Sequence, residues 1–277
     1  MALSSLIMND RSMRRRVRIA ALSALLLAGG AAPASPLPAA AAAPRAITPP
    51  VARPVTSIPT VGPLFFPSLL GLGPTLGLPH YCSASVVHSA GHDLVLTAAH
   101  CVYGTGLATE FAPGFHDGVS PYGVWAVRRA YVDPAWRTTQ DPQHDFAILQ
   151  VAPQGGHRVE DVTGANRLGA APAGGRTVTV DGYVAGSGGR PITCTNRVYY
   201  TAGYPSFDCD GYAGGVSGGP WLAGSTVVGV IGGLHQGGCT PSISYSSAFG
   251  ADVAALLARA EAGDGGDVAP IPGGDGC

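Results

Sequence analysis

Between residues 81 and 250, apolar positions fall in short runs that glycine, proline and polar residues separate. The runs with strand-like composition are 83–87, 93–97, 123–127, 147–151, 177–180, 197–201, 226–231 and 243–249. Short apolar runs bounded by turn residues are typical of β-strands. A connector rich in Gly, Ala and Pro near 163–175 divides them into two sets. The pattern predicts an all-β fold of two antiparallel units and leaves barrels and sandwiches both open.

One segment has helical composition. Residues 251–262 place Val253, Leu256 and Leu257 on one face of a short helix. The segment 263–277 that follows is rich in glycine and predicts a disordered tail.

The region before the strands has a different composition. Residues 44–75 are rich in Pro, Gly and Thr and show no period of 2 or 3.6, which favours a propeptide or an extended arm. We therefore expect the folded domain at 76–262, with one strand unit at about 76–165 and the other at about 170–250.

The chain begins with a pattern typical of a secretory signal peptide, which we place at residues 1–43. Five arginines between positions 11 and 18 precede an apolar stretch at 19–32, and small residues follow at 39–43. The apolar stretch is shorter than the roughly 20 residues that span a bilayer. We expect a secreted, extracellular protein without a membrane anchor after signal cleavage.

Composition excludes one class of partner. The net charge is −1 and only 12% of residues are charged, so no basic field is available to bind nucleic acid. Three His-Asp pairs occur at 92–93, 116–117 and 144–145, but none has the helical spacing of a zinc motif. The six cysteines form no C-x-x-C pair of the zinc-binding kind and are disulfide candidates in an exported protein. We expect no metal and no cofactor.

Three motifs carry residue types suited to nucleophilic catalysis. His100 ends the apolar segment LTAAHC, Asp145 begins HDFAIL, and Ser217 lies in GGVSGGP, at separations of 45 and 72 residues. A serine hydroxyl becomes a good nucleophile when an imidazole accepts its proton, and a carboxylate holds that imidazole in one tautomer. The three residues are therefore candidates for a catalytic triad.

The segment LTAAHC resembles the active-site histidine segment of chymotrypsin-like serine proteases, and the order His, Asp, Ser is that of the family. The resemblance implies two antiparallel Greek-key β-barrels and peptide hydrolysis by His100, Asp145 and Ser217. It also implies polypeptide substrates, a monomer, and an oxyanion hole formed by the amides of Gly215 and Ser217.

The same resemblance implies a disulfide between Cys82 and Cys101 that fixes the histidine loop. Cys194 and Cys209 bracket an expected hairpin and form a second candidate pair. Cys239 and Cys277 remain as a third pair, with a free Cys239 as the alternative.

The chain departs from trypsin in ways that affect activation and specificity. Val216 replaces the aspartate of GDSGGP and no IVGG-like sequence precedes the domain, so the ion-pair activation of trypsin is not expected, although removal of 44–75 as a zymogen segment is compatible with the sequence. The run GGVSG is closer to bacterial glutamyl endopeptidases of the V8 type. Gly211 stands where trypsin carries its specificity aspartate.

The choice of substrate side chain stays open at this point. Gly232, Gly233 and His235 are the candidate substrate-binding residues, whereas another alignment places Ile231 at the position of the glutamate-binding histidine. The remaining functional alternatives are a glutamyl-specific endopeptidase and a catalytically silent binding protein on the same fold. The intact triad argues against the silent protein.

Overall fold

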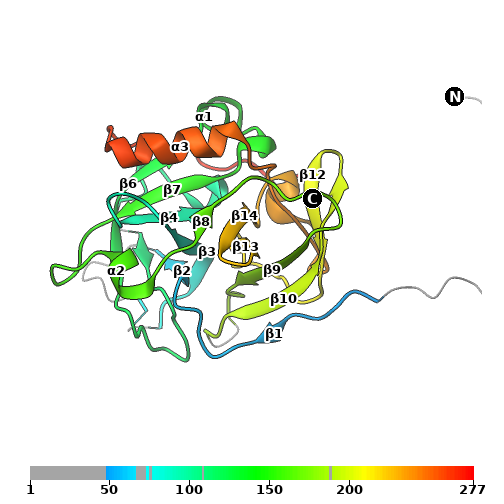
Figure 1. Ribbon diagram of the computed structural model, residues 1–277, viewed down its shortest axis with the longest axis horizontal. Coiled ribbons are helices and arrows are strands. Elements are labelled where there is room, and N and C mark those ends of the chain that lie inside the picture. The colour runs from blue at the N-terminus through cyan, green and yellow to red at the C-terminus, as the bar shows by residue number, and fades with distance from the viewer. Residues whose placement is uncertain (1–47, 67–72, 75–76, 108, 187–188) are drawn as a thin grey trace, which may run out of the picture. The chain divides into compact units, whose positions relative to one another are not determined.

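Six strands between residues 61 and 151 close into a barrel (Figure 1). The computed structural model describes residues 48–66, 73–74, 77–107, 109–186 and 189–277. The barrel order is β2-β3-β4-β7-β6-β5, with antiparallel neighbours throughout. Its strands are β2 (Val61–Phe65), β3 (His80–Val87), β4 (Leu94–Thr97), β5 (Glu110–Phe111), β6 (Trp125–Val132) and β7 (Ala147–Val151).

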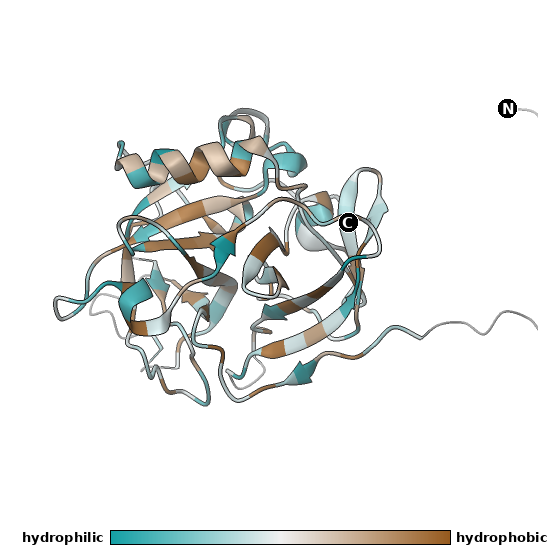
Figure 2. Ribbon diagram, in the orientation of Figure 1, coloured by the Kyte–Doolittle hydropathy of each residue, from teal (hydrophilic) through white to brown (hydrophobic). Residues whose placement is uncertain are grey.

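Hydrophobic burial explains this barrel. All residues of β4 and β7 are buried, so these central strands carry continuous apolar runs rather than an alternating pattern. Helix α3 (Ala251–Ala262) packs on β6 and β7 and covers the barrel from outside. Figure 2 shows hydrophobic colouring on the strands beneath it. Val253 and Leu256 face the core as predicted, whereas Leu257 is only partly buried.

Residues 167–245, together with β1 from the N-terminal part of the chain, form two further sheets around a separate core. Val180, Phe207 and Trp221 are fully buried in it. The six-stranded sheet has the order β1-β10-β9-β13-β14-β8 and the smaller one β11-β12-β15. The strands are β1 (Arg53–Pro54), β8 (Arg167–Leu168), β9 (Thr177–Gly182), β10 (Ile192–Arg197), β11 (Tyr199–Thr201), β12 (Tyr204–Asp208), β13 (Pro220–Ala223), β14 (Thr226–Val230) and β15 (Ile243–Tyr245).

The predicted double-barrel fold is confirmed, and one pair of the named strands in the described chain departs from antiparallel pairing. Strands β14 and β8 run parallel, because β8 belongs to the connector between the two units and returns along β14. Two short helices, α1 (Pro134–Thr139) and α2 (Val159–Thr163), lie in loops of the first unit.

The sequence predicts a propeptide or an extended arm at 44–75, with the domain starting at residue 76, but the described part of this segment supplies two strands of the fold. Strand β2 pairs with both β3 and β5 and thereby closes the first barrel, while β1 adds an edge to the second sheet. The sequence VGPLF of β2 shows no alternation, because every residue is buried. Gly62 is required there, since a Cβ would lie 2.3 Å from the carbonyl oxygen of Ala112. The domain therefore begins well before residue 76.

The expectation of a disordered C-terminal tail is also wrong. The carboxylate of Asp267 accepts hydrogen bonds from the amide of Val132 (2.8 Å) and from the guanidinium groups of Arg137 and Arg259 (3.0 Å each). The amide of Ala269 donates to Gly104 O at 2.7 Å. A few specific polar contacts hold this segment, and composition alone does not show them.

The expected signal peptide at 1–43 lies outside the described residues. In the part of the chain that the structure covers, no helix has the length and hydrophobicity needed to cross a membrane.

Candidate functional site

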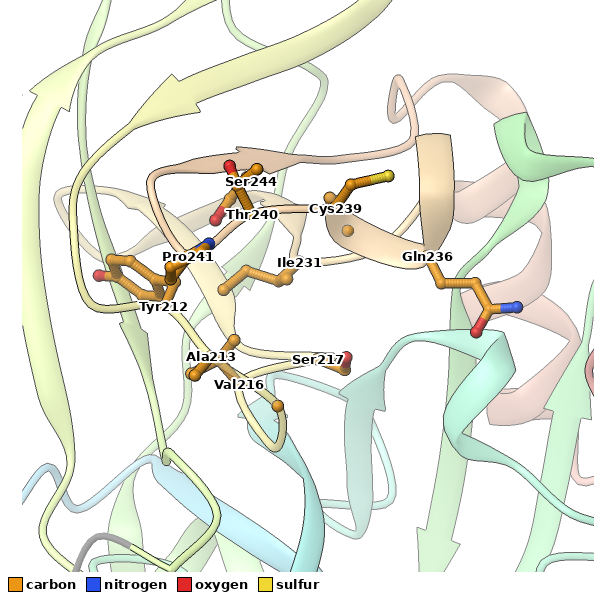
Figure 3. Close-up of a pocket in the computed structure, with 13 residues that line it drawn as sticks. Tyr212, Ala213, Val216, Ser217, Ile231, Gln236, Cys239, Thr240, Pro241 and Ser244 are labelled. Atoms are coloured by element: carbon orange, nitrogen blue, oxygen red, sulfur yellow. The ribbon is translucent and has the colours of Figure 1, made fainter. Parts of the chain in front are cut away.

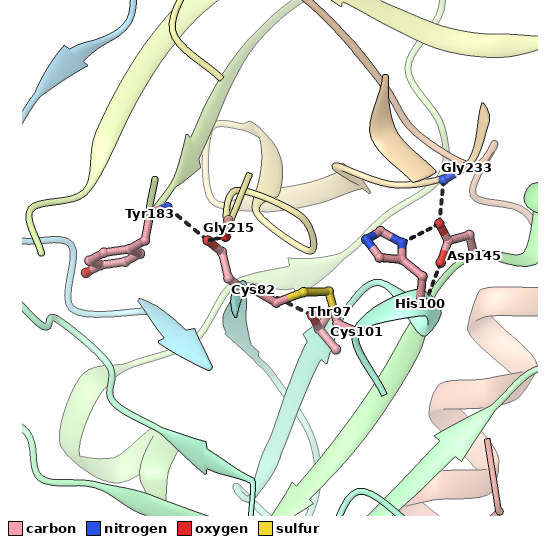
Figure 4. The surroundings of a disulfide bond; sticks show 9 residues. Cys82, Thr97, His100, Cys101, Asp145, Tyr183, Gly215 and Gly233 are labelled. Carbon is pink, nitrogen blue, oxygen red and sulfur yellow. Dashed lines mark hydrogen bonds and ion pairs between the residues drawn. A yellow bond between two sulfur atoms is a disulfide. The ribbon is translucent and has the colours of Figure 1, made fainter. Parts of the chain in front are cut away.

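His100 lies in a 3₁₀ turn, Ala99–Cys101, that directly follows β4. Its side chain is 8% exposed. A disulfide joins the adjacent Cys101 to Cys82 in β3, which ties the turn to the neighbouring strand (Figure 4). The end of an apolar strand and a covalent crosslink thus fix the backbone from which the imidazole projects.

Asp145 is completely buried and turns its carboxylate toward His100 (Figure 4). One oxygen accepts the backbone N–H of His100 at 2.9 Å; the other contacts His100 Nδ1 at 2.7 Å and accepts the N–H of Gly233 at 2.8 Å. A carboxylate with these donors is an acceptor, so Nδ1 carries the proton. Nε2 of His100 is then the lone-pair nitrogen that can accept a proton from a nucleophile.

The loop of Ser217 is anchored on β3 by a single buried serine. The N–H of Ser83 donates to Ser217 O at 2.7 Å, and Ser83 Oγ donates to Gly215 O at 2.9 Å. Ser83 Oγ also accepts the N–H of Tyr183 at 2.9 Å. Ser83 directly follows Cys82, so the histidine turn and the serine loop are held by adjacent residues of one strand.

Gly218 brings the serine loop against the strand that leads to His100. A Cβ on Gly218 would lie 2.1 Å from Thr97 Oγ1 and 3.0 Å from the amide nitrogen of Ala98. Among the described residues, Ser217 Oγ makes no hydrogen bond, so its hydroxyl is available. Catalytic hydrogen bonds are often long before substrate binds. The structure thus brings the segments of His100, Asp145 and Ser217 together.

The amides of Gly215 and Ser217 differ from their neighbours. Gly218 N–H donates to Ile231 O and Gly219 N–H to Val216 O, but those of Gly215 and Ser217 donate to no acceptor within the described chain. Gly215 has a φ of +97°, and a Cβ there would lie 2.6 Å from the nitrogen of Ala185. Only glycine fits this backbone. Two free N–H groups in one tight turn are what an oxyanion hole requires.

Val216, between these two amides, packs into the second core. It is 5% exposed, and the backbone of Gly182 lies against it. Apolar packing therefore supports the loop at the position where trypsin has an aspartate, which agrees with the expectation that no ion-pair switch operates here.

Two buried titratable groups, the carboxyl of Asp181 and the phenol of Tyr212, lie behind the serine loop, and neither presents charge to solvent. Burial raises the pKa of Asp181 to about 6, against the opposing effect of a hydrogen bond from Thr193. Burial, with a smaller contribution from Asp181, raises the pKa of the Tyr212 phenol. The Tyr212 hydroxyl donates to Val180 O at 2.6 Å.

A cavity of about 280 Å³ opens beside Ser217 (Figure 3). Side chains that line it include those of Tyr212, Ala213, Val216, Ile231, Gln236, Cys239, Thr240, Pro241 and Ser244. No Asp, Glu, Lys, Arg or His of the described chain lines it. The cavity is therefore uncharged.

The three candidate substrate-binding residues do not line this cavity. Gly232 and Gly233 instead lie against Asp145, and Gly233 supplies one of its hydrogen bonds. His235 has a φ of +53°, and its Nδ1 contacts Asp275 O at 2.9 Å in the tail. Ile231 occupies the cavity wall, as the alternative alignment predicts.

All six cysteines are paired, in the combinations expected from the sequence. Besides Cys82–Cys101, the structure has Cys194–Cys209 and Cys239–Cys277. Because Cys239 lines the cavity, the third disulfide ties the cavity wall to the C-terminal residue. The sulfurs of Cys82 and Cys101 lie near His100 but are disulfide-bonded, so they are not thiolate ligands.

Sequence reasoning missed the role of Ser83 and the contact of Gly218 with the strand before His100. Both depend on contacts between segments more than 100 residues apart. The available signals were that Ser83 follows Cys82 and that Gly218 lies in the GGVSGGP motif.

Comparison with known proteins relates the chain to one family. The trypsin-like peptidase domain matches residues 82–230, more than half of the chain. Protease Anisep from Arthrobacter nicotinovorans is 26% identical, over 76% of this chain and 100% of its own, with a TM-score of 0.63. The thermostable serine protease AL20 from an extremophilic microorganism is 25% identical over 74% and 98%, with a TM-score of 0.60.

A Glu endopeptidase solved in complex with MPD is 19% identical over 77% of this chain and 97% of its own, with a TM-score of 0.59. At this identity the likeness is one of fold. The curated proteins contain no match to the chain.

Proposed function

Because the chain belongs to the trypsin-like peptidase family and is a serine peptidase, we propose that it is an endopeptidase whose triad is His100, Asp145 and Ser217. The observation that carries this proposal is the pair of His100 and a completely buried Asp145, adjoining a serine loop with two free amides.

The reaction follows from this geometry. Ser217 Oγ attacks the peptide carbonyl carbon while Nε2 of His100 takes the hydroxyl proton. The amides of Gly215 and Ser217 donate to the oxyanion. His100 then gives its proton to the leaving amine, and an acyl-enzyme remains on Ser217. Water, deprotonated by His100, releases the acid and restores the serine.

We also place this enzyme outside the cell, acting as a monomer on polypeptides. The three disulfides support an oxidising compartment. If a segment is removed on activation, the cut lies before β2, because loss of β2 would open the first barrel.

Labelling with a fluorophosphonate tests the catalytic proposal. Wild-type protein should be modified at Ser217, since the reagent requires an activated serine and an oxyanion site. Mass spectrometry should place the adduct on the peptide that contains Ser217, and Ser217→Ala should carry none. Absence of labelling in correctly processed wild type would instead support the silent binding protein, and an adduct elsewhere would exclude Ser217 as the nucleophile.

The absence of charged residues from the cavity lining in the described chain indicates which type of substrate side chain it accepts. Tyr212, Val216 and Ile231 offer apolar surface, and no cation of the described chain lines the cavity to neutralise a glutamate. An unpaired charge is costly to bury. We propose that cleavage occurs after uncharged apolar or aromatic residues rather than after Glu, Asp, Lys or Arg.

A peptide library cleaved by the enzyme tests this preference. We expect kcat/KM to be at least about 10²-fold higher for Phe or Leu before the scissile bond than for Glu or Arg. Replacement of Ile231 by His would add a titratable hydrogen-bond donor to the cavity wall. It should reduce the ratio of kcat/KM for Phe or Leu to kcat/KM for Glu. If wild type instead cleaves fastest after Glu, the glutamyl-specific alternative is favoured, and the proposal that the uncharged cavity selects the substrate side chain is contradicted.

A further inference from the structure

A cluster of histidines and carboxylates lies at the surface of the first barrel, between the β3–β4 turn and helix α2. His88 Nδ1 contacts Glu160 Oε1 at 2.5 Å, and His92 Nδ1 contacts Asp161 Oδ1 at 2.6 Å. The two imidazole centroids are 6.2 Å apart. One ring nitrogen of each histidine and one oxygen of Glu160 all lie within 4.8 Å of one another.

Backbone contacts hold the turn and the helix in this arrangement. The other carboxylate oxygen of Glu160 accepts the N–H of Ser89 at 3.2 Å. The amide of Glu160 donates to His92 O, and that of His92 donates to Ser89 O, both at 3.1 Å. Glu261 of α3 accepts the N–H of Ala90 at 3.0 Å. The side chains therefore project from a backbone that is already ordered.

We propose that His88, His92 and Glu160 bind a divalent transition metal of the Zn²⁺ class, with Asp161 orienting the His92 ring. Two imidazoles and a carboxylate suit Zn²⁺, Cu²⁺ or Ni²⁺, whereas Ca²⁺ prefers oxygen ligands alone. A carboxylate on the second ring nitrogen is the usual partner of a metal-binding histidine. Two ligand atoms that each lie about 2.0 Å from a tetrahedral ion are roughly 3.3 Å apart. The distance between His88 Nδ1 and Glu160 Oε1, which is 2.5 Å, therefore has to increase by less than about 1 Å on metal binding.

The site is independent of the catalytic centre. It lies at the start of β4, whereas His100 follows its end. A bound ion would crosslink the β3–β4 turn to α2 and stabilise the barrel without touching the reacting atoms. Glu160 lies 72 residues after His88, so motif spacing does not reveal the full ligand set, and the expectation of no metal rests on spacing alone.

Titration calorimetry of the full chain with ZnCl₂ tests the proposal. We expect one equivalent of Zn²⁺ to bind and to raise the thermal unfolding midpoint, and CaCl₂ to do neither. His92→Asn and Glu160→Gln should each weaken Zn²⁺ binding at least about 10-fold. Asn tolerates the φ of +54° at position 92, and Gln at 160 can still accept from Ser89. His116→Asn, on a different loop, is the matched control and should bind as wild type.

A second measurement needs no variant. Zn²⁺ should protect His88 and His92 of wild type from diethylpyrocarbonate while leaving His116 reactive. The proposal is overturned if wild type binds no Zn²⁺, or if His88 and His92 react with diethylpyrocarbonate equally well with and without Zn²⁺. It is also overturned if the two ligand variants bind Zn²⁺ as tightly as His116→Asn does.

Discussion

Replacement of His100 by alanine should lower kcat for peptide hydrolysis by about 10⁶-fold with the fold retained. The loss is large because, among the described residues, His100 is the one base that contacts Asp145, so Ser217 would keep its proton. The fold should survive, because Asp145 keeps the backbone donors of His100 and Gly233. Single-turnover kinetics on a cleavable peptide, with urea unfolding of the same protein, measures both effects.

The loss of kcat in Asp145→Asn provides a comparison for the loss in His100→Ala. An amide at this position can hold His100 in the wrong tautomer, and a kcat loss of about 10⁴-fold is expected, smaller than for the histidine. His157→Ala serves as the control, since this histidine is exposed and outside the site. A His100→Ala protein that retains more than about a hundredth of wild-type kcat would remove His100 from the mechanism.

The candidate residues of this site could be selected from the sequence because local motifs carry them. His100, Asp145 and Ser217 each lie in a short segment whose composition places the residue at a strand end or in a glycine-rich turn. The strands with apolar runs, such as β4 and β7, were predictable for the same reason.

What sequence did not predict depends on contacts between distant segments. Strand β2 lacks a pattern because all its residues are buried, including Gly62 and Pro63. Asp267 with its two arginine partners and the disulfide of Cys277 hold the tail, so its glycine-rich composition misleads. His235 satisfies the motif of a specificity residue, but its turn aims it at the tail.

These long-range contacts converge on β3. Cys82 fixes the turn that holds His100, the proposed base, and Ser83, the next residue, fixes the loop that holds Ser217, the proposed nucleophile. Base and nucleophile come from different barrels, so their relative position depends on this strand and on the close approach of Gly218. The precision of catalytic geometry should therefore be sensitive to changes that leave the triad intact.

Gly218→Ala should demonstrate this sensitivity. The new Cβ would lie 2.1 Å from Thr97 Oγ1 and 2.2 Å from Ser83 O, and the φ of +78° disfavours any residue with a Cβ. The serine loop must move away from β4, which changes the position of Ser217 relative to His100. We expect kcat/KM to fall about 10²-fold or more. The backbone strain alone should lower the free energy of unfolding by about 1–3 kcal/mol.

Gly214→Ala is the matched control from the same loop. A Cβ there meets nothing within 4 Å, and its φ lies outside the positive range. Because Gly214 borders the cavity, the comparison uses urea unfolding and the rate of fluorophosphonate labelling rather than KM. Gly214→Ala should match wild type in both, whereas Gly218→Ala should be less stable and label slowly. Equal labelling rates for the two variants would show that contact with β4 does not position Ser217, and that the hydrogen bonds from Ser83 suffice.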